Sequence, residues 1–148
     1  LTVMHKMRGL IAIIAVVLTS SFQQGSESFI LEVSGLRSTQ GVLRISLYNQ
    51  EKGFPENPKA AFRTYTVPVS GARTAVNMGV LPPGRYAIAL MHDENNNKKM
   101  DKNKLGIPRE GFGFSNNPKI RFSAPSFEKA GFEVKPGKKG IAIQLTYF

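Results

Sequence analysis

Apolar and polar residues alternate with a period of two over most of the chain from residue 29 onward, with no useful stretch of helical period. Such alternation places apolar side chains on one face of a β-strand and polar side chains on the other. The alternating segments lie at residues 29–34, 42–48, 63–69, 74–78, 86–91, 132–134 and 141–147. About seven strands at this spacing predict an all-β fold, a single antiparallel Greek-key β-sandwich of immunoglobulin-like or prealbumin-like type. Single helical turns are expected at 59–62 and 126–130.

The segment 81–86, Leu-Pro-Pro-Gly-Arg-Tyr, marks the entry to one of these strands. A tyrosine two residues after a turn glycine is typical of the tyrosine corner of Greek-key sandwiches, whose hydroxyl group bonds backbone a few residues upstream. Tyr86 and the alternate residues after it are therefore expected in the core. The residues between them are also apolar, so the other face of this strand needs a cover. We expect that cover in a long loop at 93–125, which contains Phe112, Phe114 and Phe122.

The first residues have the pattern of a secretory signal peptide. Lys6 and Arg8 precede nine consecutive apolar residues at 10–18, and small polar residues follow at 19–21. A membrane-spanning helix needs about twenty apolar residues, so this run is too short to span. We therefore predict a signal peptide at 1–22, a β-sandwich domain at 28–148, and no transmembrane span after cleavage. The predicted location is periplasmic or secreted.

Composition narrows the chemistry further. The chain has 148 residues and no cysteine, which excludes disulfides, thiolate metal sites and a cysteine nucleophile. Residues 1–22 hold two cations and no acid, so the remainder keeps 18 cations against 10 acids. A basic exported surface favours anionic partners, and anionic cell-surface polymers or lipid head groups are the expected ones. Basic and aromatic residues also interleave in one segment, at Arg109, Phe112, Phe114, Lys119, Arg121 and Phe122. Surfaces that bind single-stranded nucleic acid have such a pattern. Nucleic acid is nevertheless not an expected partner of an exported protein.

A candidate calcium loop follows the strand at 86–91. Oxygen-bearing side chains recur at the first, third, fifth and ninth positions of a loop, as in the front half of a D-x-[DN]-x-[DN] calcium loop. The predicted metal residues are Asp93, Asn95, Asn97, Lys99 (through its carbonyl group) and Asp101. A bound Ca²⁺ would staple the long loop rather than do chemistry. The alternative is an asparagine-rich solvated loop without metal.

Two positions depart from a complete calcium loop. Lys104 stands at the twelfth position, where an EF-hand has a bidentate glutamate, and Lys98 stands at the sixth, where glycine is preferred. Glu94 or Glu110 could complete the ligand shell, although the spacing selects neither.

His92 is the only histidine after residue 22 and so the only candidate imidazole base. An alternative reading is a hydrolase-type enzyme that uses His92 with Asp93 or Glu110. No serine or cysteine nucleophile is tied to this histidine by a motif, so a half-buried structural histidine is favoured and no catalytic residue is assigned. The expectation is that the protein is not an enzyme.

Three stretches resemble the bacterial exported family called domain of unknown function 2141. They are residues 86–95 with the later Asp101, residues 106–117 (Gly-Ile-Pro-Arg-Glu-Gly-Phe-Gly-Phe-Ser-Asn-Asn), and residues 124–127 (Ala-Pro-Ser-Phe). The resemblance covers about residues 28–148 and implies one exported β domain with no established activity. In that family the loop usually has glycine where Asn96 and Lys98 stand here. The segment 81–86, followed along the chain by the Asp/Asn loop at 93–101, is more loosely similar to transthyretin-like and adhesin B-type modules.

Taken together, these features favour a non-catalytic accessory or binding domain of unknown ligand, exported and with a calcium-stapled loop. A structural surface module that binds anionic polymers is the second alternative, beside the hydrolase.

Overall fold

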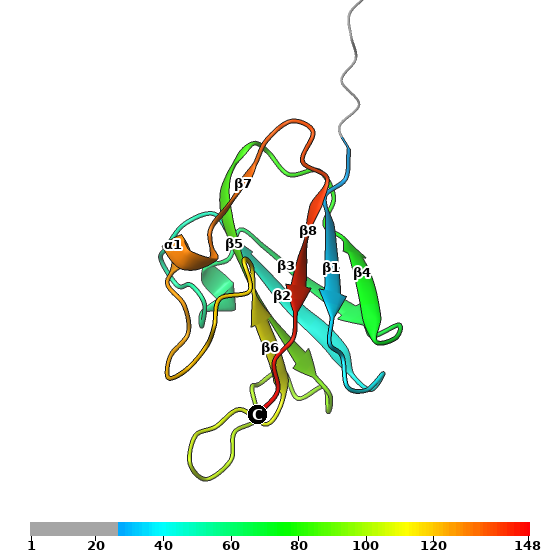
Figure 1. Ribbon diagram of the computed structural model, residues 1–148, viewed down its shortest axis with the longest axis vertical. Helices are drawn as coiled ribbons and strands as arrows, with labels where there is room; N and C mark the ends of the chain where they lie inside the picture. The colour runs from blue at the N-terminus through cyan, green and yellow to red at the C-terminus, as the bar shows by residue number, and fades with distance from the viewer. Residues whose placement is uncertain (1–26) are drawn as a thin grey trace, which may run out of the picture.

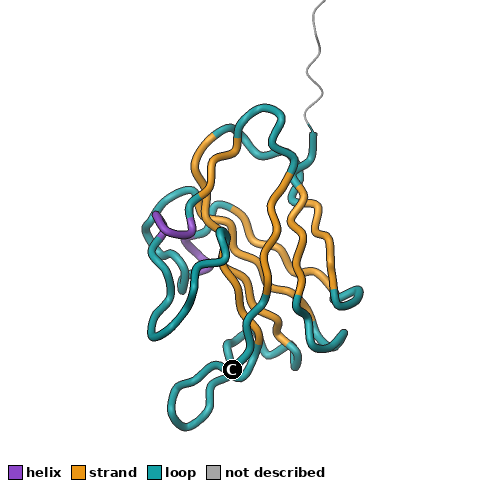
Figure 2. Tube along the Cα trace, in the orientation of Figure 1, coloured by secondary structure: helices purple, strands orange, loops and turns teal. Residues whose placement is uncertain are grey.

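The computed structural model describes residues 27–148, which form a two-layer β-sandwich (Figure 1). Figure 2 shows that strands dominate and that helix is confined to short turns. The predicted signal peptide at 1–22 lies outside the described residues. Within residues 27–148, no helix has the length and apolar character that crossing a membrane requires.

The first sheet has three strands in the order β4 (Arg73–Asn77), β1 (Ile30–Ser34) and β8 (Gly140–Gln144). β1 pairs with β4 in the antiparallel direction and with β8 in the parallel direction. The strand pairs are mostly antiparallel, as predicted, and β1–β8 is the parallel exception among the described strands. It arises because the chain enters β8 from the other sheet rather than through a hairpin.

The second sheet has the order β3 (Arg63–Pro68), β2 (Val42–Tyr48), β5 (Gly84–Asp93) and β6 (Gly111–Phe114). A fifth strand, β7 (Phe132–Val134), pairs with the beginning of β5. All pairs in this sheet are antiparallel. The chain passes between the two sheets four times, so the layers cannot separate without disturbing most of the strands.

The core lies between the sheets, where the alternating apolar side chains meet. Leu31, Ile45, Ile88 and Ile143 are completely or almost completely buried there, as the period-two pattern predicts. Tyr86 is also buried, and its hydroxyl group donates a hydrogen bond of 2.9 Å to the Pro82 carbonyl oxygen. This confirms the predicted tyrosine corner and fixes the start of β5, the strand that leads to the candidate site.

Residues 27–148 form eight strands rather than about seven, because β6 lies inside the segment predicted as a loop. Gly111 and Gly113 alternate with Phe112 and Phe114 in this strand. Because glycine has no side chain, the strand lacks the alternation of apolar and polar residues by which the other strands were predicted. A Cβ at Gly111 would lie 2.4 Å from Cζ of Tyr147, and one at Gly113 would lie 2.7 Å from Cγ2 of Ile143. The glycines therefore allow β6 to approach the C-terminal segment closely.

Aromatic side chains cover the outer face of the second sheet. Phe54 contacts Tyr48, Phe114 and Phe127, with ring centroids 5.2 to 6.2 Å apart. Phe54 follows β2, and Phe127 begins the short helix α1 (Phe127–Ala130); the 3-10 turn η1 (Pro58–Ala60) lies nearby in sequence. The segment 93–125 thus supplies only part of the predicted cover. Phe122 was expected to belong to it, but its side chain is fully exposed.

Candidate functional site

The connection between β5 and β6 emerges at the end of the sandwich opposite to the entry of residue 27 (Figure 1). Glu110 fixes its base: one carboxylate oxygen accepts a hydrogen bond from the Glu94 N–H and the other from the Asp101 N–H, both at 3.1 Å. The carboxylate is buried, and burial raises the pKa of Glu110, with a further contribution from the nearby carboxylates. Glu110 therefore ties together the two ends of the predicted calcium loop.

Asp93 is fully buried at the end of β5 and is held by protein donors on both oxygens. Oδ2 accepts from Arg44 Nε at 2.5 Å and from the Lys98 N–H at 2.9 Å, and Oδ1 accepts from the Asn97 N–H at 3.0 Å. Burial alone would raise the pKa of Asp93, but the Arg44 and backbone hydrogen bonds outweigh it and hold the pKa below its usual value. Arg44 also donates from Nη2 to Oδ1 of Asn96 at 2.6 Å.

Three other predicted metal residues come together beside Asp93. The side-chain amide groups of Asn95 and Asn97 donate to the two oxygens of Asp101 at 2.6 and 2.9 Å. Their carbonyl oxygens accept from backbone N–H groups, Asn95 from Asn97 and Asn97 from Lys99. The structure therefore brings three residues of the predicted set together, through hydrogen bonds among their own side chains.

A calcium ion at this place would have to replace several of these hydrogen bonds. Within residues 27–148, no three His, Cys, Asp or Glu side chains converge in a way that could hold a metal ion. Glu94 and Glu110, the two acids that could have completed the shell, both bond to protein donors. Calcium binding at Asp93–Asp101 stays a prediction.

The loop backbone takes the left-handed conformation at Asn96 and Lys98, with φ of 58° and 67°. These are the two positions at which the resembled family usually has glycine, the residue that adopts positive φ without strain. Both positions therefore have a backbone conformation that favours glycine, although neither carries one. Asparagine tolerates this conformation readily, whereas lysine does so at a cost.

Glu94 joins the loop to a neighbouring segment of the domain. Its carboxylate accepts hydrogen bonds from Arg37 at 2.5 Å and from the Ser38 hydroxyl group at 2.7 Å. The Arg37 hydrogen bond lowers the pKa of Glu94. Arg37 in turn lies 4.5 Å from the centroid of the Tyr147 ring. The base of the connection is therefore tied to the β1–β2 turn and to the C-terminal segment.

His92 is fully buried, and both of its ring nitrogens have partners. Nε2 lies 2.7 Å from the Gln40 carbonyl oxygen, which can only accept, so Nε2 carries a proton. Nδ1 lies 2.8 Å from the Tyr147 hydroxyl group, which donates to it when the ring is neutral. These contacts join β5 to the β1–β2 turn and the C-terminal segment. They give His92 a structural position and do not favour the hydrolase alternative.

The distal part of the connection, residues 98–109, is a tight turn with an apolar tip. Asn103 organises it, because its Oδ1 accepts from the N–H groups of Leu105 and Ile107 at 2.8 and 3.0 Å. Its own N–H donates to the Ile107 carbonyl oxygen at 2.9 Å. Gly106 has a φ of 79° and allows the chain to reverse. The Leu105 side chain consequently projects into solvent.

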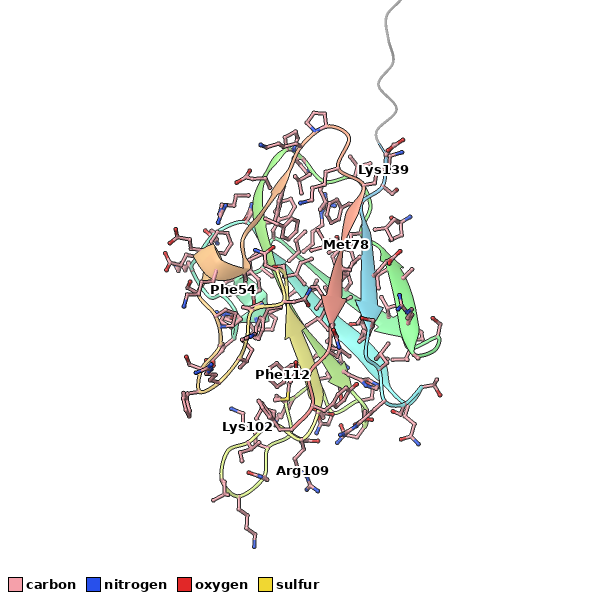
Figure 3. All side chains as sticks on the ribbon, in the orientation of Figure 1. Phe54, Met78, Lys102, Arg109, Phe112 and Lys139 are labelled. Carbon is pink, nitrogen blue, oxygen red and sulfur yellow. The ribbon has the colours of Figure 1, made fainter. Side chains whose placement is uncertain are left out.

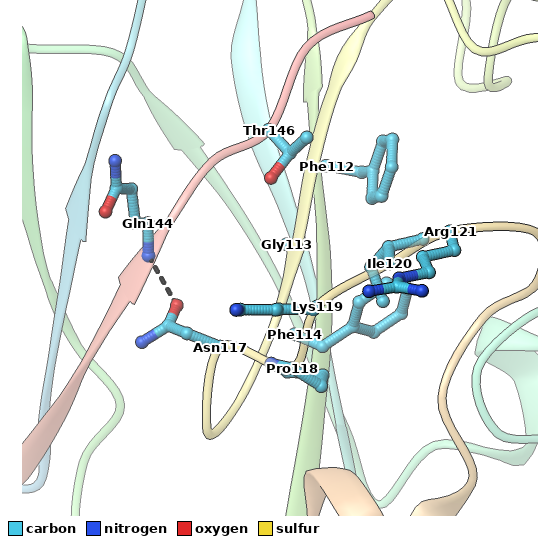
Figure 4. Close-up of a pocket in the computed structure, with 10 residues that line it drawn as sticks. All are labelled: Phe112, Gly113, Phe114, Asn117, Pro118, Lys119, Ile120, Arg121, Gln144 and Thr146. Carbon is cyan, nitrogen blue, oxygen red and sulfur yellow. Dashed lines mark hydrogen bonds between the residues drawn. The ribbon is translucent and has the colours of Figure 1, made fainter.

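A second loop, residues 117–122, lies beside β6 and borders a cavity of about 480 Å³ (Figure 4). Asn117 fixes it to β8: its Oδ1 accepts from the Gln144 N–H at 2.8 Å and its Nδ2 donates to the Ala142 carbonyl oxygen. Lys119 and Arg121 line the cavity together with Phe112 and Phe114. The exposed Phe122 follows directly.

We refer to residues 98–109, residues 117–122 and Phe148 as the loop end. Phe148 belongs to it because its ring lies 5.6 Å from that of Phe112 and borders a cavity of about 670 Å³ beside residues 102–109. The loop end contains seven lysine or arginine residues and one carboxylate, Asp101. Figure 3 places Lys102 and Arg109 there and Lys139 at the opposite end of the domain. Sequence reasoning missed this grouping, although it found the net charge.

Comparisons with known proteins add one finding. Neither the curated proteins nor the solved structures contain a match to this chain. A family model does match, over residues 31–142, which reach from β1 into β8 and include the whole of the 93–110 connection. This match covers most of the chain and agrees with the residues that carry the sequence resemblance. The chain therefore belongs to the family described as "Uncharacterized protein conserved in bacteria (DUF2141)".

Proposed function

We propose that this protein is an exported, non-catalytic binding domain that attaches to anionic groups of the cell envelope through its loop end. The observation that carries the proposal is the concentration of seven cations and one carboxylate on the two loops that precede and follow β6. Export, to the periplasm or beyond the cell, rests on the signal-peptide pattern at residues 1–22. An anionic partner rests on the charge of the loop end.

The contacts of the acidic residues explain why this end is positive. Asp93 and Glu94 bond to Arg44 and Arg37, Glu110 bonds to backbone N–H groups, and Asp101 accepts from two asparagine side chains. The four ion pairs found within residues 27–148 include none of the loop-end cations. The lysine and arginine charges therefore remain available to an external partner.

The shape of the loop end also suits binding. The Glu110 and Asn103 hydrogen bonds hold residues 98–109, and Asn117 holds the second loop, so the cations lie on ordered segments. A partner gains more from charges that are already in place, because less conformational entropy is lost on binding. A Ca²⁺ staple at Asp93–Asp101, which we retain as a separate proposal, would strengthen the same base without changing this role.

Retention on immobilised heparin and binding to phosphatidylglycerol vesicles test the proposal. The triple variant Lys99→Gln/Lys102→Gln/Lys104→Gln should lose about a hundredfold in affinity, since each cation near an anionic surface contributes roughly 1 kcal/mol. The control, Lys135→Gln/Lys138→Gln/Lys139→Gln, makes the same charge change near the opposite end and should bind nearly as the parent does. Binding of the parent should weaken steeply as salt rises. The proposal is wrong if the parent binds neither probe, or if both variants lose affinity equally.

A further inference from the structure

We infer that the loop end docks on a lipid bilayer that contains anionic phospholipid, and that the side chains of Leu105 and Phe122 enter the bilayer. This inference rests on the proposed function and names its partner. Charge alone suits a soluble polymer as well as a membrane. The apolar side chains distinguish the two.

Exposed apolar side chains are concentrated at the loop end. Six large hydrophobic residues are exposed within residues 27–148, and the three most exposed all lie there: Phe122 at 100%, Leu105 at 84% and Phe148 at 61%. Ile107, at 40%, is a fourth. Single exposed apolar residues are ordinary, but several on one end of a domain indicate a binding surface.

The backbone of the first loop prevents Leu105 from folding back. The Asn103 side chain accepts from the N–H groups on both sides of the turn, and Gly106 N–H donates to the Asn103 carbonyl oxygen at 2.9 Å. Arg109 N–H donates to the Asp101 carbonyl oxygen at 2.8 Å and closes the base of the turn. The tip therefore holds its leucine outward. Lys102 and Lys104 stand next to it, where they would meet lipid phosphates as Leu105 enters the apolar layer.

Phe122 has a comparable position on the second loop. Asn117 attaches that loop to β8, and Asn116 attaches it to the other side, where its Nδ2 donates to the Gly131 carbonyl oxygen at 2.7 Å. The cavity that this loop borders is lined by Phe112 and Phe114, yet the Phe122 ring stays outside it. Arg121 precedes Phe122 and supplies the adjacent cation. Both loops thus combine an outward apolar residue with flanking positive charge.

A bilayer satisfies both features, whereas a soluble polyanion satisfies only one. Lipid phosphates pair with the cations, and the boundary between head groups and acyl chains accepts a leucine and an aromatic ring. A polysaccharide or nucleic acid in water leaves Leu105 exposed as before. The observations therefore favour the membrane, and a second copy of the chain is an alternative occupant that the experiment must separate.

Vesicle binding by two matched variants tests the inference. Leu105→Ser/Phe122→Ser should bind vesicles of phosphatidylglycerol and phosphatidylcholine at least a hundredfold more weakly than the parent, because each side chain contributes tenfold or more when it leaves water. Binding to heparin should change less than twofold. The control is Val80→Ser, since Val80 is 45% exposed but lies away from the loop end. Its neighbour Gly79 accepts a hydrogen bond from the Phe29 N–H near the start of the domain. This variant should bind vesicles and heparin as the parent does. The melting temperatures of these variants should match that of the parent, since the replaced side chains lie in solvent.

A fluorescence measurement reports insertion directly. The chain has no tryptophan, so Phe122→Trp and Leu105→Trp each introduce a single reporter. With anionic vesicles, both emission spectra should shift to shorter wavelength and be quenched by lipids brominated on their acyl chains. An unshifted spectrum together with vesicle binding that is unaffected by the serine variant would overturn the inference and leave the proposed function standing. A concentration-dependent dimer that disappears in the serine variant would also overturn it. Absence of binding to both vesicles and heparin would instead refute the proposed function.

Discussion

Removal of the Arg44 guanidinium group tests whether an internal ion pair holds the base of the loop end. Arg44→Met keeps most of the side-chain volume but removes the guanidinium group that pairs with the fully buried Asp93. Breaking a buried ion pair from one side costs about 3–5 kcal/mol, because the remaining charge stays out of water. Asp93 keeps its two backbone N–H donors, Asn97 and Lys98, so we expect a loss of about 2–3 kcal/mol. For a domain of this size, that is a fall in melting temperature of roughly 10 °C.

Thermal and urea denaturation measure the effect in four variants: Arg44→Met, Asp93→Asn, their combination and a control. The control is Arg85→Met, because Arg85 and Glu133 form an ion pair at 3.3 Å in which both side chains are about 45% exposed. An exposed pair of this kind contributes less than about 1 kcal/mol. The double variant Arg44→Met/Asp93→Asn removes the unpaired charge and should regain part of the stability. The reasoning is refuted if Arg44→Met costs no more than Arg85→Met, or if Asp93→Asn adds its full cost to that of Arg44→Met.

Three further predictions follow from the same contacts. Gly113→Ala places a methyl group 2.7 Å from Cγ2 of Ile143 and should cost about 1–3 kcal/mol in urea denaturation, whereas Gly71→Ala, with 3.8 Å to its nearest neighbour, should be close to neutral. Because the folded pKa values of Asp93 and Glu94 are lowered, their stabilisation is present above the unfolded values near 4 and is lost as pH falls through the folded ones; the melting temperature should drop in acid, and Glu94→Gln should reduce that drop. Calcium at about ten times its Kd should stabilise the protein by ~1.4 kcal/mol, and calorimetric titration of chelator-treated protein measures this; no heat and no melting shift would contradict the calcium site.

The β-sandwich could be predicted from the sequence because most strands have one buried and one solvated face. In β1 and β2 the alternation of apolar and polar residues matches the alternation of burial, and Tyr86 could be assigned by its place after the turn glycine. β6 could not be predicted, since Gly111 and Gly113 remove half of the pattern. Glycine is needed at these two positions because Tyr147 and Ile143, from a distant part of the chain, pack closely against β6.

The candidate site could be predicted only in part. The spacing of oxygen-bearing residues put Asn95, Asn97 and Asp101 in one set, and hydrogen bonds join these side chains because a short loop brings its alternate residues to one side. The partner of Asp93 could not be foreseen, since it depends on the register that sets Arg44 opposite Met91 on β5. The exposure of Phe122 was missed for a similar reason. A phenylalanine of the 93–125 loop was expected to cover the outer face of the second sheet, but Phe54 packs there instead. Phe54 lies in a turn segment, where no alternation of apolar and polar residues indicates burial.

The carboxylates of the 93–110 connection bond to groups of the protein itself, and this leaves the exposed surface of the loop end positively charged. A calcium loop concentrates acids around an ion, but here Arg44 brings a protein cation to Asp93, and the asparagine amide groups satisfy Asp101. The loop backbone has positive φ at Asn96 and Lys98, and its carboxylates bond to groups of the protein itself. None of the ion pairs within residues 27–148 includes a lysine of the loop end, and these lysine side chains are exposed. The order of the loop and the positive charge of its surface consequently have one cause, so a variant that frees Asp93 from Arg44 should weaken binding to anionic vesicles as well as folding.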